Sequence, residues 1–123
     1  MQNKSASTKR FPFETLDAYW VAHAALGKIV AHKGKLRGLP GEVASQLERA
    51  AVSVVANICE ASGRVSVADR RNRYAIARGE ANEVGGCLAI VQLYGVFSDE
   101  DYVWLRESYL RVAYMLTGLI KKR

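Results

Sequence analysis

The chain of 123 residues holds few of the residue types on which secreted proteins, membrane proteins and most metalloproteins depend. Its two cysteines, Cys59 and Cys87, are too few for a disulfide scaffold and lie within apolar stretches, so we expect free thiols in a reducing compartment. No apolar run approaches the roughly 20 residues of a membrane span. The first ten residues lack the apolar middle region of a secretory signal. Together these absences predict a cytoplasmic protein with no membrane partner.

Histidine is equally scarce, since only His23 and His32 occur. His23 falls on an apolar helical row and is expected in the core, whereas His32 lies in a basic run and is expected to be solvated. Neither follows a glutamate at the Glu-x-x-His step of metal sites in helical bundles, and neither cysteine has a second cysteine at zinc spacing. No phosphate-cradling Gly-x-x-x-x-Gly-Lys loop occurs. We therefore expect no metal, no cofactor and no enzyme activity.

The sequence does have helical periodicity, in four segments separated by short breaks, and no segment alternates with a period of two. The four predicted core rows are Leu16, Tyr19, His23, Leu26 and Val30; Val43, Leu47, Ala50, Val54, Ile58 and Ala61; Tyr74, Ala77, Ala81, Val84, Leu88 and Val91; and Tyr102, Leu105, Tyr109, Val112, Leu116 and Leu119. Four such helices with short connections predict an all-α fold, an antiparallel up-down-up-down four-helix bundle. Residues 1–10 are expected to form a flexible basic tail before a single domain over residues 11–123.

The breaks carry residues that typically end or begin helices. Glycines in the stretch 33–41 are expected to stop the first helix, and Gly63 is expected to end the second as a left-handed cap. Ser66 and Ser98 are the expected N-caps of the third and fourth helices, each followed by acidic residues that suit the positive end of the helix dipole.

The third and fourth segments carry more apolar residues than a monomeric bundle needs. Gly85 and Gly86 lie in the middle of a helix, where each costs up to about 1 kcal/mol relative to alanine. They come level with Tyr109 and Leu110 and are expected to make room for these side chains; tolerated surface glycines are the alternative. The second apolar row comprises Ile76, Cys87, Ile90 and Tyr94 on the third segment and Val103, Leu110 and Tyr114 on the fourth. Such a row indicates an interface between subunits.

Polar residues share one face of the second helix, because they recur at steps of four, four and three. They are Arg49, Ser53, Asn57 and Glu60. Folding of the second and third helices against each other is expected to bring Glu60 near Arg70 and Arg71, and Asn57 near Arg73. Glu83 and Arg111 are expected to pair across the third and fourth helices. A salt-bridged structural seam is favoured over a binding site here.

The formal charge of +6, from 18 Lys and Arg against 12 Asp and Glu, is unevenly placed. In an up-down bundle the N-terminal tail, the turn between the second and third helices and the C-terminus lie at one end, which we call the basic end. It holds ten cations against four carboxylates, so the whole formal excess lies there. The expected nucleic-acid-binding residues are Arg64, Arg70, Arg71, Arg73, Lys121, Lys122 and Arg123. Phe11 and Phe13 are the only aromatic candidates nearby, which favours contact with phosphates over sequence reading.

The second segment also carries a resemblance to a known family. Residues 46–63 read QLERAAVSVVANICEASG, and this stretch resembles the bacterial four-helix-bundle family encoded in intervening sequences of large-subunit ribosomal RNA genes. Softer likenesses at residues 16–22, 77–84 and 115–120 extend the resemblance over about residues 12–121. Val55 stands where the family usually has proline, so the kink that this proline would cause is expected to be absent.

The resemblance implies a four-helix bundle, a homo-oligomer commonly built as a homopentamer, and no established enzyme activity. Relatives of the family include accessory proteins of diversity-generating retroelements, which bind nucleic acid together with a reverse transcriptase. From residues and resemblance together we expect a non-enzymatic oligomer that binds nucleic acid, with RNA favoured, through its basic end. The alternative is a protein-interaction adaptor for a nucleic-acid-bound partner such as a reverse transcriptase. An enzyme that uses Arg49, Asn57 and Glu60 is the least favoured interpretation.

Overall fold

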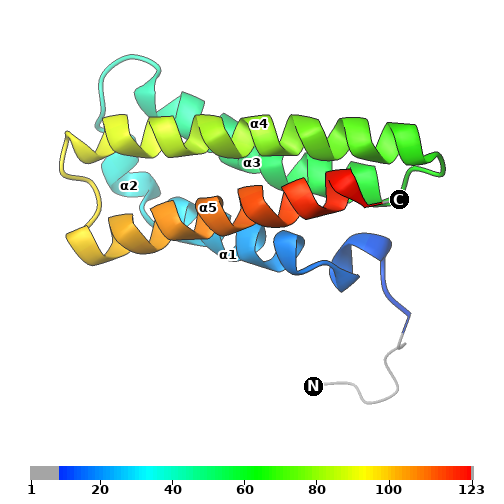
Figure 1. Ribbon diagram of the computed structural model, residues 1–123. Helices are drawn as coiled ribbons and strands as arrows, with labels where there is room; N and C mark the ends of the chain where they lie inside the picture. Colours follow the sequence, from blue (N-terminus) through cyan, green and yellow to red (C-terminus); the bar gives the residue numbers. More distant parts are fainter. Residues whose placement is uncertain (1–8, 123) are drawn as a thin grey trace.

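The structure, a computed structural model, describes residues 9–122, and its long helices lie alongside one another in alternating directions (Figure 1). Helix α3 packs against α4, α4 packs against α5, and α1 packs against both α3 and α5. The described residues contain no strand. The elements are η1 (Pro12–Thr15), α1 (Asp17–Ala31), α2 (Lys33–Leu36), α3 (Val43–Ser62), α4 (Val67–Gln92) and α5 (Asp99–Lys121). The predicted up-down-up-down four-helix bundle is confirmed.

Two of the predicted helix starts are confirmed by their hydrogen bonds. The Ser66 hydroxyl accepts a hydrogen bond from the backbone N–H of Asp69 at 3.0 Å, and the Ser98 hydroxyl accepts one from Asp101 at 3.0 Å. Each bond satisfies a backbone donor that the first turn of a helix leaves without a partner.

The predicted left-handed cap at Gly63 is wrong. Gly63 has φ −92°, and its N–H donates to the Glu60 carbonyl, so the backbone leaves α3 in a tighter right-handed turn. The left-handed glycines of the described chain are Gly41, before α3, and Gly95, between α4 and α5. The first break also differs from expectation, because α1 ends at Ala31 and the short helix α2 then includes Gly34.

The core rows predicted for α3, α4 and α5 are confirmed apart from half-buried residues at the row ends, whereas the row predicted for α1 is only partly right, because Leu16, Tyr19 and Leu26 are half-buried against the core and its other two residues are exposed. The buried face of α1 consists of Ala18, Ala22, Ala25 and Ile29. His23 and Val30, both predicted to be core residues, are exposed. The row was misplaced because three of the four buried residues are alanines, whose small side chains give a weaker hydropathy signal than the larger residues beside them.

The glycines of α4 do not make room for side chains of α5 within the chain. A Cβ atom added at Gly85 or Gly86 would meet no atom of the described residues within 4 Å, so that expectation is wrong and both positions are open. Cys87, expected in the second apolar row, is buried instead. Helix α3 runs unbroken through Val55.

Candidate nucleic-acid interface

The structure brings four predicted cations of the basic end together around the last turn of α5. The beginning of α1, the turn between α3 and α4, and the end of α5 all lie at this end of the bundle (Figure 1). A guanidinium nitrogen of Arg71, on α4, donates to the backbone carbonyl of Lys122 at 3.3 Å. Arg70 donates to the carbonyls of Arg64 and Val65 at 3.0 and 2.8 Å and so secures the turn before α4.

Two other predicted cations of this end are paired with a carboxylate. Glu60 accepts from Arg64 at 2.9 Å and lies 3.3 Å from Arg73. Among the described residues Glu60 forms no ion pair with Arg70 or Arg71, because Arg70 turns back to the carbonyls of the turn. Arg123 and the tail residues 1–8 lie outside the described residues; Lys9 and Arg10 are exposed.

No ion pair within the described residues involves Arg70, Arg71, Lys121 or Lys122, and these four side chains border two hollows. The first hollow has a volume of about 240 Å³, and we call it the cleft. The cleft is lined by Leu16, Val67, Arg70, Arg71, Tyr74, Leu119 and Lys122. The second hollow, of about 760 Å³, is lined by Val67, Arg71, Ile120 and Lys121. Arg71 lines both, and its Nε is buried without a hydrogen-bond partner in the part of the chain that the structure describes.

An aromatic cluster at the same end was only partly predicted from the sequence. Phe11 stacks on Phe13 with ring centres 5.3 Å apart, Phe13 contacts Tyr19 at 4.7 Å, and Tyr19 contacts Trp20 at 4.8 Å. The Trp20 indole N–H donates to the Glu14 carbonyl at 2.9 Å, which ties the start of α1 to η1. Phe11 is 66% exposed and Trp20 48% exposed. The sequence pointed to Phe11 and Phe13 but did not indicate that Trp20 would extend their surface.

Comparison with known proteins identifies the family. The model of the 23S rRNA-intervening sequence protein family matches residues 15–118. The chain belongs to this family. A crystal structure of a protein of unknown function from the S23 ribosomal protein family of Bacteroides thetaiotaomicron is similar, with 25% sequence identity and a TM-score of 0.76. The similarity covers 85% of this chain and 99% of that chain. Comparison with curated proteins gives no match.

In this intervening-sequence protein the polar face of α3 is turned toward α4. Arg49 forms an ion pair with Glu83 and lies 3.8 Å from Glu80. The expected pairing of Glu83 with Arg111 is therefore wrong, because α3 supplies a nearer guanidinium. Burial raises the pKa of Glu80, and the neighbouring Glu83 charge raises it further.

The rest of this polar face continues toward the basic end. The Asn57 amide donates to the hydroxyl of Ser53 at 3.0 Å, and its oxygen accepts from Arg73 at 3.5 Å, as the expected proximity of Asn57 and Arg73 requires. The side-chain contacts of this polar face are made within the face itself, with α4, or with the turn before α4. The residues concerned are Arg49, Ser53, Asn57 and Glu60.

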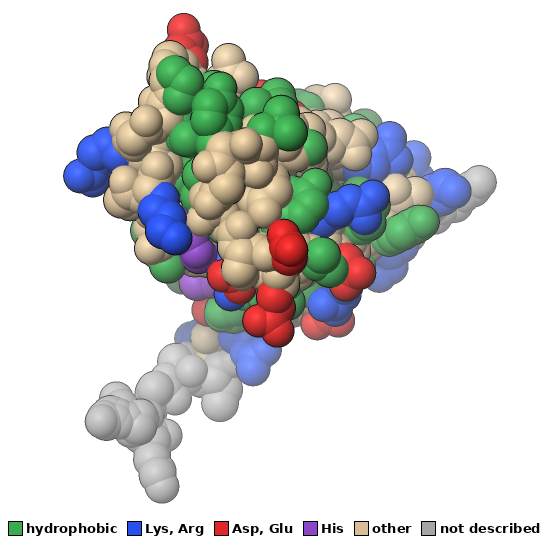
Figure 2. Space-filling model, turned by 90° about the vertical axis from the view of Figure 1, so that its left-hand side faces the viewer, with side chains coloured by type: hydrophobic (Ala, Val, Ile, Leu, Met, Phe, Trp, Pro, Cys, Tyr) green, Lys and Arg blue, Asp and Glu red, His purple; other side chains and the backbone are tan. Residues whose placement is uncertain are grey.

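The opposite end of the bundle holds a cluster that the sequence did not predict. The Lys28 ammonium lies 2.9 Å from Asp101, and the Lys28 hydrogen bond is the main cause that lowers the pKa of Asp101. His32 is half-buried rather than solvated, with Nε2 3.6 Å from Asp101 and its ring 4.8 Å from that of Phe97. Figure 2 faces this end and shows acidic and basic side chains side by side, with histidine among them.

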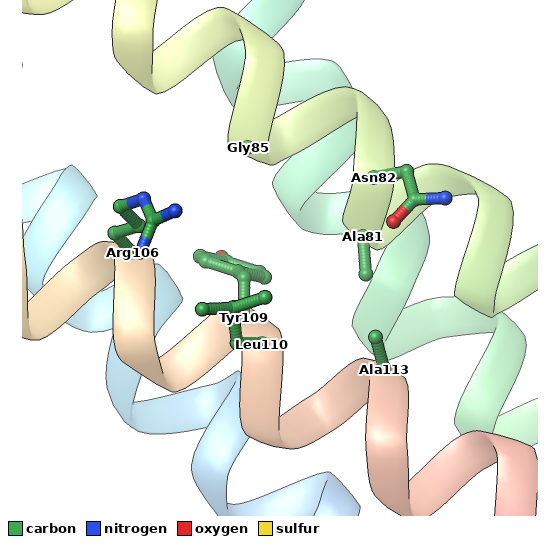
Figure 3. Close-up of a pocket in the computed structure, with 7 residues that line it drawn as sticks. All are labelled: Ala81, Asn82, Gly85, Arg106, Tyr109, Leu110 and Ala113. Carbon is green, nitrogen blue, oxygen red and sulfur yellow. The ribbon is translucent and has the colours of Figure 1, made fainter.

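The outer surface between α4 and α5 is also hollowed. In Figure 3 Gly85 on α4 lies across this hollow from Tyr109 and Leu110 on α5. The hollow has a volume of about 220 Å³. The α5 side chains Val103, Leu110 and Tyr114 are exposed, and Leu110 lines this hollow, whereas the exposed Ile76 and Ile90 of α4 do not line it. Within residues 9–122, no group of His, Cys, Asp and Glu could hold a metal ion. The described helices also include none with the length and apolar character needed to cross a bilayer.

Proposed function

We propose that this member of the 23S rRNA-intervening sequence protein family is a non-enzymatic, oligomeric helical bundle that binds nucleic acid through its basic end. The observation that carries the proposal is the difference between two sets of cations at that end. Arg64 and Arg73 share Glu60, whereas Arg70, Arg71, Lys121 and Lys122 surround the last turn of α5 without a carboxylate partner among the described residues. Cations grouped in this way attract the phosphates of a nucleic acid.

RNA is the favoured ligand within this proposal. The family takes its name from intervening sequences of 23S rRNA, and the exposed aromatic rings of Phe11 and Trp20 at the basic end suit the unpaired bases that RNA commonly presents. The main contribution to affinity comes from phosphate contacts, which carry no sequence information.

Self-assembly is the second part of the proposal. Leu110 and Tyr114 are 45% and 78% exposed on α5, and a Cβ atom added at Gly85 or Gly86 of α4 would meet no described residue within 4 Å. Another subunit would bury this apolar surface, and the resemblance to the family suggests a homopentamer. Exposed apolar patches of this kind are typical of protein interfaces.

The test compares two double variants that each remove two positive charges. We expect Arg70→Gln with Arg71→Gln to weaken binding to RNA and to reduce the slope of log affinity against log salt by about 0.7 for each phosphate that the variant no longer binds. Lys35→Gln with Arg37→Gln is the matched control, because both residues are exposed and lie at the opposite end. Lys33 is unsuitable as a control, since it lies 3.9 Å from Glu48.

Thermal melts must accompany the binding measurements, because Arg70 also holds the turn before α4. Equal losses of affinity from both double variants, or no binding by the unmodified protein at low salt, would contradict nucleic-acid binding through the basic end. The protein-interaction adaptor would then be the better explanation of the exposed apolar surface on α4 and α5.

A further inference from the structure

The cleft at the basic end joins an apolar wall to a cationic rim. Leu16 from the start of α1, Tyr74 from α4 and Leu119 from α5 form the wall. Arg70, Arg71 and Lys122 form the rim, and none of the described lining residues is acidic. A ligand that fits this surface has one anionic part and one flat or apolar part next to it.

Arg71 carries the donor that marks the anionic part of the site. Its Nε is buried and has no hydrogen-bond partner among residues 9–122, although another nitrogen of the same guanidinium donates to the Lys122 carbonyl. A buried donor without an acceptor costs free energy, and a turn of the guanidinium that brings Nε to the surface of the cleft would let an anion there accept from it. Because guanidinium groups bind phosphate oxygens with two donors, a phosphate fits this position well.

The size of the cleft limits the other part of the ligand. Its volume of about 240 Å³ lies below the roughly 300–1,000 Å³ of pockets that enclose a drug-sized ligand. A single base or sugar therefore fits, whereas a double helix does not enter. Bases can leave their stack only where they are unpaired, and proteins then hold them against aromatic and apolar side chains.

We propose that the cleft binds one unpaired nucleotide of a single-stranded RNA, with its phosphate on Arg71 and Lys122. The base lies against the wall of Leu16, Tyr74 and Leu119. The aromatic cluster at the same end, where Phe11 and Trp20 are exposed, offers stacking surfaces for neighbouring bases. This inference rests on the proposed function and adds a preference for single strands, which phosphate contacts alone would not give.

The test fills the cleft without changing the charge. Val67 is 42% exposed and lines the cleft, so Val67→Trp should obstruct it while leaving every cation in place. Val65 is 94% exposed, lies two residues earlier and is not part of the cleft lining, so Val65→Trp is the matched control. The ligands are a short oligouridine and an RNA duplex with the same number of phosphates, both measured by fluorescence anisotropy at low salt.

We expect Val67→Trp to weaken oligouridine binding about tenfold, the effect of removing one stacked base, and to leave duplex binding within about twofold. Val65→Trp should change neither. If Val67→Trp affects both ligands equally or affects neither, the cleft is not a base site and the inference is overturned, while phosphate binding stands. If the unmodified protein binds neither ligand, the proposed function itself fails. Should Val67→Trp not fold, as judged by its thermal melt, Val67→Phe makes the same comparison.

Competition separates a nucleotide site from a simple phosphate site. Uridine monophosphate should displace labelled oligouridine at concentrations where inorganic phosphate does not, because only the nucleotide occupies the apolar wall. Equal displacement by inorganic phosphate would overturn the inference.

Fluorescence tests the stacking role of the aromatic cluster. In a Trp104→Phe variant, Trp20 is the only tryptophan. If bases stack on the cluster, oligouridine should quench the Trp20 fluorescence more than the duplex does; equal quenching by both ligands contradicts this role.

Discussion

At the scale of single residues, three buried side-chain atoms of the described chain lack a hydrogen-bond partner, and their surroundings differ. Arg71 Nε borders the cleft, and Glu80 Oε1 lies 3.8 Å from a guanidinium nitrogen of Arg49. The Tyr109 hydroxyl belongs to a core residue that is only 3% exposed. Burial raises the pKa of Tyr109 well above its ordinary value of 10.0. The hydroxyl is therefore a local weakness of the core.

Replacing Tyr109 with phenylalanine should stabilise the protein. Tyr109→Phe keeps the ring that fills the core and removes a polar atom whose desolvation is not compensated, so we expect a gain of about 1 kcal/mol in the free energy of unfolding. Chemical denaturation at neutral pH measures this gain. A loss of stability would mean that the hydroxyl has a partner in the folded protein.

The same variant should respond less to alkaline pH. Below pH 10 Tyr109 is protonated in both the folded and unfolded states, so its raised folded-state pKa has no effect there. Above pH 10 the unfolded chain ionises first, and the stability that depends on the neutral ring is progressively lost. The difference in melting temperature between Tyr109→Phe and the unmodified protein should therefore widen as the pH rises above 10.

At the scale of helices, the sequence predicted α3, α4 and α5 better than α1. The rows of α3 and α5 contain Val, Leu and Ile at nearly every turn, and such rows are easily distinguished from the polar residues beside them. On α1 the buried alanines Ala18, Ala22 and Ala25 alternate with larger residues such as Tyr19 and Leu26 that are only half-buried. Size and hydropathy therefore favoured the wrong row, and only the packing of α1 against α3 and α5 decides between the two.

The contact between α1 and α5 through Lys28 and Asp101 shows another limit of sequence analysis. The two residues are 73 positions apart, so no local pattern joins them. The sequence correctly placed Asp101 in the first turn of α5, where an acidic residue is favourable. It could not indicate that the same carboxylate also accepts a hydrogen bond from Lys28 and lies near His32.

Asp101→Asn should reduce the loss of folding stability that occurs as the pH falls. The folded-state pKa of Asp101 lies below its ordinary value of 3.8 because Lys28 donates to it. The resulting stability is present above pH 3.8 and is lost as the pH falls through the folded-state pKa. Unfolding measured from pH 6 down to about 2 should show a smaller decline for Asp101→Asn than for the unmodified protein. Asp99→Asn is the control, because Asp99 lies in the same turn and forms no ion pair among the described residues. This variant should lose stability at low pH as the unmodified protein does. An equally reduced loss of stability in both variants would contradict a specific role for the Lys28 contact.

At the scale of the whole molecule, helix directions alone were enough to predict the basic end. Four antiparallel helices place the start of α1, the turn after α3 and the end of α5 together, whatever the details of packing. The pairing of Glu60 with Arg64 follows an i, i+4 step that is visible in the sequence, whereas its pairing with Arg73 depends on the shape of the turn between α3 and α4. The cleft was also hidden, since Leu16, Tyr74 and Leu119 belong to predicted core rows and only the folded chain leaves a hollow beside them.

The assembly proposed for the protein can be tested by placing a charge on its outer surface. Leu110→Glu should reduce the sedimentation coefficient toward that of a monomer, because a carboxylate buried between subunits without a partner is unfavourable. Val30→Glu is the control, since Val30 on α1 is exposed to a similar extent, 48% against 45% for Leu110. An unmodified protein that sediments as a monomer at all concentrations would exclude the oligomer, and equal effects of both variants would place the interface elsewhere.

Arg70, Arg71, Lys121 and Lys122, which form no ion pair with another described residue, lie at one end of an elongated bundle, and this position has a consequence for symmetry. Subunits related by a rotation axis parallel to the helices would carry their basic ends on one face, and a strand held by one subunit would meet the next at a raised effective concentration. Subunits related by a twofold axis perpendicular to the helices would carry these ends on opposite sides. The direction of the symmetry axis therefore decides whether one assembly grips a single strand repeatedly or tethers two separate strands.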